Sequence, residues 1–233
     1  MKKLLVMGLL AAAGASQAVT LYSNGPVVDG SGLSILNSGV DSTLGAGSNA
    51  TATLADNFTV TGSPWAVGSL DFFGYQTGAV GFTFTSVTWS LRAGADVNTA
   101  TVLASGTTAV TNGGLVGYRV TPTTLTNTAR AIYRINADIP DINLAAGSYF
   151  VTWALAGTSP SGPFVPPVLG SVGTGNALQS VGAAYVPLAD GLSLSGFDVP
   201  FAIQSAVPEP TSLALLLAGG LTVGGMARRR QAR

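Results

Sequence analysis

Apolar and polar residues alternate with a period of two through the middle of this chain, and this pattern constrains the fold more than any other feature. The alternation is clearest over residues 87–92, 130–135 and 149–155. Because successive side chains of a strand point to opposite faces, each such segment predicts a strand with one buried face. No stretch of twelve residues between the two ends has the period of a helix with a charged face. The sequence therefore predicts an all-β domain.

Further strands are expected where similar segments are bounded by turn residues. They cover residues 56–60, 65–76, 82–92, 101–105, 115–121 and 197–204, and the breaks are Thr61–Pro64, Asn112–Gly114, Ala145–Gly147 and Thr158–Pro163. At least eight strands at hairpin spacing predict an antiparallel β-sandwich with a jelly-roll or related Greek-key path over residues 55–206. A closed barrel is the alternative. Residues 19–54 alternate little, and we expect an irregular lead-in or an irregular pair of strands there.

The chain contains no cysteine and no histidine, and both of its lysines lie within the first three residues. These absences exclude thiol nucleophiles, Ser-His-Asp catalysis and imidazole-bound metals, and they leave a serine without its usual base. Paired carboxylates, as in glycoside hydrolysis, are the remaining catalytic option. The candidate pairs are Asp56 with Asp71 and Asp138 with Asp141, of which the second is expected in a loop as two solvated charges. We expect no enzymatic activity and no cofactor.

Charge is segregated along the chain, although the formal net charge is zero. Residues 19–206 contain four arginines and nine aspartates, which gives this part a net charge of −5. A surface of that sign repels the phosphate backbone of nucleic acids. Nucleic acid is therefore not expected to be a partner.

The N-terminus has the three parts of a secretory signal peptide. Two lysines follow Met1, residues 4–15 are almost wholly apolar, and Ser16 and Ala18 are the small residues that precede a cleavage site. We expect cleavage after Ala18, so that residues 1–18 are removed and the rest of the chain is exported.

The C-terminus has a second tripartite pattern. The segment 207–212 reads Val-Pro-Glu-Pro-Thr-Ser, the 17 uncharged residues 211–227 follow, and a basic tail occupies residues 228–233. At about 1.5 Å per residue, a helix over 211–227 would be roughly 25 Å long, which is the short end of what crosses a bilayer. Its most apolar positions are Leu213, Leu215, Leu216, Leu217, Leu221 and Val223. The arginines behind the helix predict that it stops with the tail in the cytoplasm.

This tail resembles the PEP-CTERM sorting signal of Gram-negative bacteria. The resemblance rests on Val207, Pro208, Glu209 and Pro210, on the apolar helix, and on the stop-transfer cluster Arg228, Arg229 and Arg230. Glu209 is the only glutamate in the chain, and it falls inside the triplet. Because proline cannot continue a helix and keeps its predecessor extended, the triplet suits recognition by a protease. A permanent single-pass anchor is the alternative interpretation of the tail.

The resemblance implies that an exosortase, a membrane-embedded cysteine protease and transpeptidase, recognises the triplet and discards the helix. The protein would be held in the inner membrane transiently and then reach the outer surface or the extracellular matrix. Proteins with such tails are associated with exopolysaccharide and biofilm formation, so exopolysaccharide is an expected partner. Short strings within residues 55–204 also resemble secreted sandwich domains found before such tails, which implies an architecture and no activity.

A carbohydrate-binding, lectin-like surface is the main alternative function, and a carboxylate glycosidase ranks below it. Trp65, beside a proline in a turn, and Tyr185 are the candidate residues for stacking on a sugar ring. Trp89 and Trp153 lie within alternating strands, so core packing is expected of them. No window has the alternating acidic ligands of a calcium loop, and the segment Asp29–Gly32 comes nearest to one. A structural calcium ion held by distant aspartates stays an open alternative. No other metal site is expected.

Overall fold

The structure is a computed structural model that describes residues 17–36 and 42–207. In this part of the chain every regular element is a β-strand, and there is no helix. The strands are β1 (Thr20–Ser23), β2 (Leu33–Ile35), β3 (Ala46–Gly47), β4 (Thr53–Val60), β5 (Trp65–Gly74), β6 (Phe84–Ala93), β7 (Thr101–Ala109), β8 (Thr111–Val120), β9 (Ala131–Leu144), β10 (Gly147–Gly157), β11 (Phe164–Val165), β12 (Leu178–Ser180), β13 (Val186–Pro187) and β14 (Phe201–Ser205). The predicted all-β class is confirmed.

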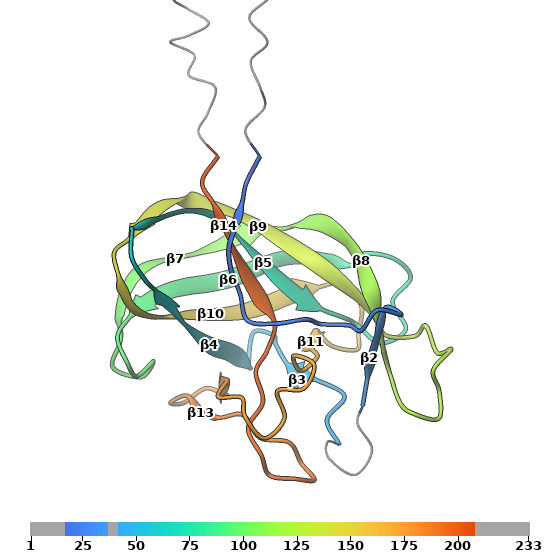
Figure 1. The fold of residues 1–233 in the computed structure, drawn as a ribbon. Coiled ribbons are helices and arrows are strands. Elements are labelled where there is room, and N and C mark those ends of the chain that lie inside the picture. The colour runs from blue at the N-terminus through green and yellow to red at the C-terminus, as the bar shows by residue number, and fades with distance from the viewer. Residues whose placement is uncertain (1–16, 37–41, 208–233) are drawn as a thin grey trace, which may run out of the picture. The chain divides into compact units, whose positions relative to one another are not determined.

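Most of these strands form two six-stranded sheets (Figure 1). The first sheet has the order β1-β14-β5-β9-β8-β2, and the second has the order β13-β12-β4-β10-β6-β7. A separate small sheet pairs β3 with β11. Neighbouring strands are antiparallel, with the exception of β2 and β8, which run parallel. Two antiparallel sheets are consistent with the predicted sandwich.

The inner faces of the two sheets share one hydrophobic core. Phe72 on β5 and Phe201 on β14 belong to the first sheet, and both contact Trp153 on β10 of the second sheet, with ring centroids 5.2 and 5.9 Å apart. Trp89 lies directly opposite Trp153 in the register of β6 and β10. Both tryptophans are buried, so their predicted role in the core is confirmed. The period-two pattern of these strands is thus explained by one face that packs on the opposite sheet.

Residues 19–54 are part of the domain. β1 pairs with β14, β2 pairs with β8, and the compact unit runs from Val19 to Ala206. The expected boundary at residue 55 is therefore not an edge of that unit. The three strands in this segment have two to four residues, which is too short for alternation to show. β1 and β2 are strands because the longer strands β14 and β8 offer them a free edge, whereas β3 pairs with the equally short β11.

The break predicted at Asn112–Gly114 is wrong, because these residues lie inside β8. The register between β8 and β9 shifts between Asn112 and Leu115, which marks a bulge. A Cβ on Gly113 would lie 3.0 Å from the carbonyl oxygen of Arg134, and Gly114 has a φ of +108°. The glycines thus allow two backbones to approach closely, and the chain instead turns at Val110, between β7 and β8.

The loop predicted at residues 138–141 is also a strand, the later part of β9. Pro140 is tolerated there because the register shifts, with Asp138 opposite Ser69 and Ile142 opposite Val67. Such irregularities are where strands admit proline. Asp138 and Asp141 are both exposed, as expected for solvated charges.

The expected signal peptide and sorting signal fall almost wholly outside the described residues. Residues 1–16 and 208–233 are not described, which includes Pro208, Glu209, Pro210, the helix at 211–227 and the arginine cluster. Within residues 17–36 and 42–207, no helix is long and apolar enough to span a membrane.

Candidate functional site

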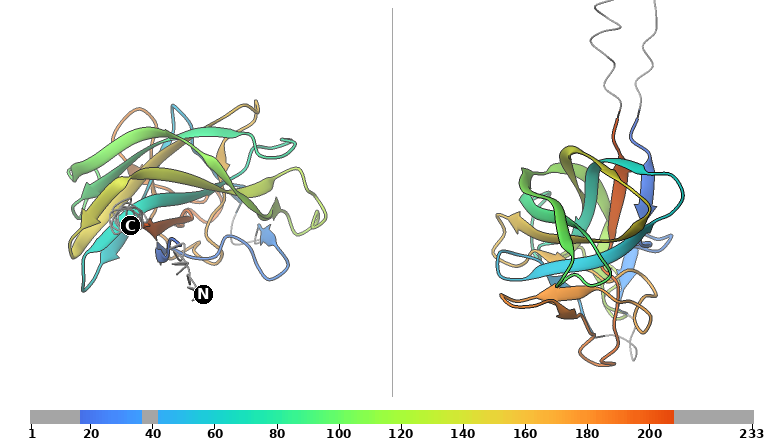
Figure 2. Two further views of the ribbon diagram at one scale, coloured as in Figure 1. Left: turned by 90° about the horizontal axis from the view of Figure 1, so that it is seen from above. Right: turned by 90° about the vertical axis from the view of Figure 1, so that its left-hand side faces the viewer.

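The two expected processing points flank the compact unit. At its start, the Val19 N–H donates to Ser205 Oγ at 2.9 Å and the Val19 carbonyl accepts from the Ser205 N–H at 2.8 Å. At its end, the Ala206 N–H donates to the Ala66 carbonyl at 2.7 Å. β1 and β14 consequently run side by side, as the right-hand view of Figure 2 also shows. Ala18 and Val207 are exposed and lie just outside these bonds.

The two candidate stacking aromatics lie on different sheets and are partly covered. Trp65 begins β5, and its ring stacks on Phe58 with a centroid distance of 6.1 Å and an interplanar angle of 11°. Tyr185 lies between β12 and β13, with the Arg92 guanidinium 5.7 Å from its ring centroid. Both side chains are half-buried. The structure therefore does not bring them together into one platform.

The two buried carboxylates expected as a catalytic pair are also separate. Asp56 is on β4 of the second sheet and Asp71 is on β5 of the first. Asp71 accepts hydrogen bonds from Asn136 Nδ2 at 2.9 Å and from Gln204 Nε2 at 2.8 Å. These partners come from the two strands on either side of β5. Asp71 is thus held in a cross-strand polar row and does not face Asp56.

Asp56 is a buried acid whose pKa is strongly raised. It accepts hydrogen bonds from Asn24 Nδ2 at 3.0 Å, from the Val199 N–H at 3.1 Å and from the Asn57 N–H at 2.8 Å. Burial, reinforced by the nearby charge of Asp198, nevertheless raises its pKa to about 7. This buried carboxyl group joins β4 to the chain before β14.

Asp190 organises a second polar centre. Its carboxylate accepts hydrogen bonds from the main-chain N–H groups of Ser42, Thr43, Leu192 and Ser193, at 2.7 to 2.9 Å. Burial by itself raises the pKa of Asp190, but these four donors outweigh it and hold the pKa well below its usual range. The carboxylate ties residues 42–43 to the loop before β14, which is a structural role.

The described residues offer little to a metal ion. Within them, no group of three or more acidic side chains lies close enough to hold one. The segment at Asp29, which comes nearest to a calcium loop in sequence, forms a turn instead. Asp29 Oδ1 accepts from the N–H groups of Ser31 at 2.8 Å and Leu33 at 3.0 Å.

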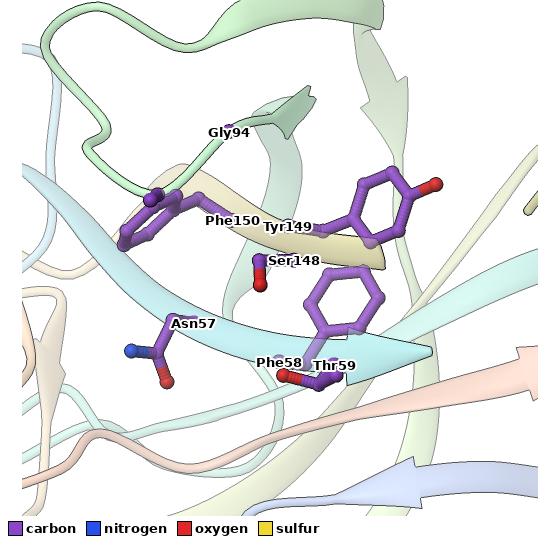
Figure 3. A pocket seen from close by; sticks show the side chains of 8 residues that line it. Asn57, Phe58, Thr59, Gly94, Ser148, Tyr149 and Phe150 are labelled. Atoms are coloured by element: carbon purple, nitrogen blue, oxygen red, sulfur yellow. The ribbon is translucent and has the colours of Figure 1, made fainter. Parts of the chain in front are cut away.

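A small pocket opens on the outer side of the second sheet (Figure 3). Its volume is about 160 Å³. β4 and β10 form its floor, and the chain just after β6 forms one wall. The lining residues are Asn57, Phe58, Thr59, Gly94, Ala95, Ser148, Tyr149 and Phe150.

Strand register decides which side chains the pocket presents. Asn57 lies opposite Phe150, and Thr59 lies opposite Ser148. The residues between them, Phe58 and Tyr149, stack on each other in the core with centroids 5.4 Å apart. Figure 3 shows these two rings lying together, apart from Asn57, Ser148 and Phe150. The outer face of β4 and β10 therefore offers an amide, two hydroxyls and one aromatic ring.

Sequence reasoning missed this pocket, although alternation holds part of the information. The pattern places Asn57 and Thr59 on the polar face of the strand at 56–60, and Ser148 on the polar face of the strand around 149–155. It does not tell which strand lies beside which. The pairing of β4 with β10, some ninety residues apart, appears only in the structure.

No family model matches this chain, and the search of curated proteins found no similar sequence. What is established is the fold class, all-β with two antiparallel sheets that share a core. Any function must therefore be argued from the chain's own residues.

Proposed function

We propose that this chain is an exported, non-enzymatic surface or matrix protein that a transient C-terminal membrane tether delivers. An exosortase would cut the tether beside Pro208–Pro210, after which the domain joins the outer surface or the extracellular polysaccharide. The tail's three parts support the tether, and the N-terminal pattern supports export through the inner membrane.

One observation carries the proposal: the compact unit ends where the sequence predicts processing. The unit covers Val19–Ala206, while cleavage is expected after Ala18 and beside a triplet that begins at Pro208. Cutting at both points would leave all fourteen strands intact. Only Val207 separates the hydrogen-bonded Ala206 from the triplet, so the protease would act close to the folded domain.

The strand order supports a jelly-roll path for the delivered domain. β4, β5 and β6 alternate between the second and first sheets, and β14 returns to lie between β1 and β5. Such crossings between two sheets are typical of Greek-key and jelly-roll sandwiches. In this interpretation the neighbouring strands β8 and β9 together take the place of one strand of an eight-stranded jelly roll.

The absence of catalysis is supported by how the acids are used. Asp56, Asp71 and Asp190 each accept hydrogen bonds from neighbouring main-chain or amide groups, and the exposed Asp138 and Asp141 lie on one strand. With no histidine or cysteine anywhere in the chain, no activated nucleophile is at hand.

The proposal is tested by changing the triplet in the native host. In the variant Pro208→Ala with Glu209→Gln, we expect the protein to stay in the membrane fraction at full C-terminal length, while the unaltered chain appears outside the cell. The matched control changes the other proline–acid pair, Pro140→Ala with Asp141→Asn, which is exposed on β9. The control should be released normally. Equal release of the triplet variant would contradict the proposal.

A further inference from the structure

The pocket on β4 and β10 presents polar side chains that form no hydrogen bonds with other described residues of the protein. Among the described residues, the side chains of Asn57, Thr59 and Ser148 make no hydrogen bond within the protein, and all three are exposed. An asparagine amide offers two donors and an acceptor, and each hydroxyl offers a donor and acceptor sites. A ligand in this pocket would therefore meet both donors and acceptors within one small area.

The opposite side of the pocket is apolar. Phe150 is 6% exposed and packs with Ala55 and Val97 in a small cluster outside the sheet. Its ring is fixed by these neighbours, and it borders the pocket beside Asn57, its partner in the register. The pocket thus has a small apolar edge that suits C–H groups, and the rest of its surface suits hydroxyl groups.

No lining residue carries a charge. Arg92 lies opposite Phe150 on β6, but its guanidinium interacts with other residues. Its Nε donates a hydrogen bond to Ser90 Oγ at 3.0 Å, and the guanidinium lies over the Tyr185 ring. Without a cation in the lining, nothing favours a phosphate, a sulfate or an acidic sugar over a neutral ligand. The volume of about 160 Å³ is well below that of pockets for drug-sized ligands, so it suits a single ring.

The walls are held in place before any ligand arrives. β4 and β10 pair continuously from Leu54 to Val60. The Gly94 N–H donates to the Ser148 carbonyl at 3.0 Å, and Gly94 has a φ of +149° that other residues rarely adopt. Further along the same loop, Asn98 exchanges two hydrogen bonds with the main chain of Tyr185, at 2.7 and 3.0 Å. Such preorganisation lowers the entropic cost of binding.

We propose that this pocket binds one neutral sugar ring of a polysaccharide chain. Asn57, Thr59 and Ser148 hydrogen-bond the ring hydroxyls and carry most of the binding, and the small exposed edge of Phe150 contacts C–H groups of the sugar. Tyr185 contributes by anchoring the loop that forms the wall, and Trp65 takes no part. This inference is independent of C-terminal processing, because it concerns the folded unit alone.

Affinity electrophoresis of the purified full chain in native gels tests the proposal. The gels contain one neutral polysaccharide each, namely dextran, laminarin, yeast mannan or galactomannan, and a further gel contains anionic polygalacturonate. We expect retardation by at least one neutral polymer. Loss of two hydrogen-bonding side chains in Asn57→Ala with Ser148→Ala should weaken that binding at least tenfold. Asn143→Ala, an exposed position on β9 of the other sheet, should leave it unchanged.

A second variant separates binding from folding. Ser148→Trp keeps a residue suited to a strand and fills the pocket with its indole, so it should abolish retardation. Cooperative urea unfolding, followed by far-ultraviolet circular dichroism, should show that the variant is folded. The proposal is overturned if none of the neutral polymers retards the chain, if only polygalacturonate does so, or if the folded pocket variants bind as the unaltered chain does.

Discussion

At the scale of single residues, the buried aspartates Asp56 and Asp190 have pKa values that are shifted in opposite directions. Asp56 is desolvated and close to Asp198, so its neutral form is favoured, whereas Asp190 receives four main-chain N–H groups that favour its charge. No composition count could separate them, because the difference lies in the hydrogen-bond donors that the fold places around each carboxylate. The two residues therefore make opposite contributions to the pH dependence of stability.

The raised pKa of Asp56 makes the domain less stable as the pH rises. Its pKa is about 7 when folded against 3.8 ordinarily, so between these values the folded chain holds a proton that the unfolded chain has released. From pH 5 to pH 8 we expect the free energy of unfolding to fall by up to about 3 kcal/mol from this group. In Asp56→Asn that decrease should vanish. Urea unfolding of both proteins at the two pH values measures it, and equal slopes would contradict the assignment.

Asp190→Ala should destabilise the domain by about 2 kcal/mol at neutral pH, because the main-chain N–H donors of residues 42, 43, 192 and 193 lose a charged acceptor. The lowered pKa means that the stabilisation by Asp190 is present above its ordinary pKa and is lost as the pH falls through the folded value. Thermal unfolding should show a larger difference between the variant and the unaltered chain at pH 7 than at pH 2. Asp138→Ala, an exposed carboxylate, serves as the control and should cost little at either pH.

At the scale of elements, the longer strands could be predicted and their partners could not. Alternation identified β5, β6, β9 and β10 because each has one face in the core. It carried no information on β1, β2 and β3, whose few residues pair with edges supplied from far along the chain. The turn residues were misleading at the glycines of β8 and the proline of β9, because bulges use the same residue types as turns.

The claim that the early segment belongs to the domain can be tested at the contact between β2 and β8. A Cβ on Gly117 would lie 2.0 Å from the carbonyl oxygen of Gly32, so Gly117→Ala must push the chain before β2 away from β8. We expect a loss of about 2–3 kcal/mol in unfolding free energy. Gly30→Ala, where nothing lies within 4 Å of the added Cβ, should be close to neutral. A neutral Gly117→Ala would mean that the early segment is not docked.

At the scale of the whole molecule, the compact domain and the two segments proposed to direct its export and release are separate parts of one chain. The compact unit holds the core, the pocket and the buried aspartates Asp56, Asp71 and Asp190, and the two segments expected to direct export and release lie outside it in the sequence. The sequence alone can predict such segments, because the features that define them are local: charge, apolar length and proline. The pocket could not be predicted in the same way, because it depends on the pairing of distant strands.

The measurement that tests this account most directly is the intact mass of the protein recovered from its host, with and without the exosortase. With the enzyme present, we predict a species that begins at Val19 and has lost the segment after the triplet, Arg233 included. Without the enzyme, the full C-terminus should be retained and the protein should remain with the membrane. An exported species that carries Arg233 in the presence of the enzyme, or identical masses in both strains, would contradict the account.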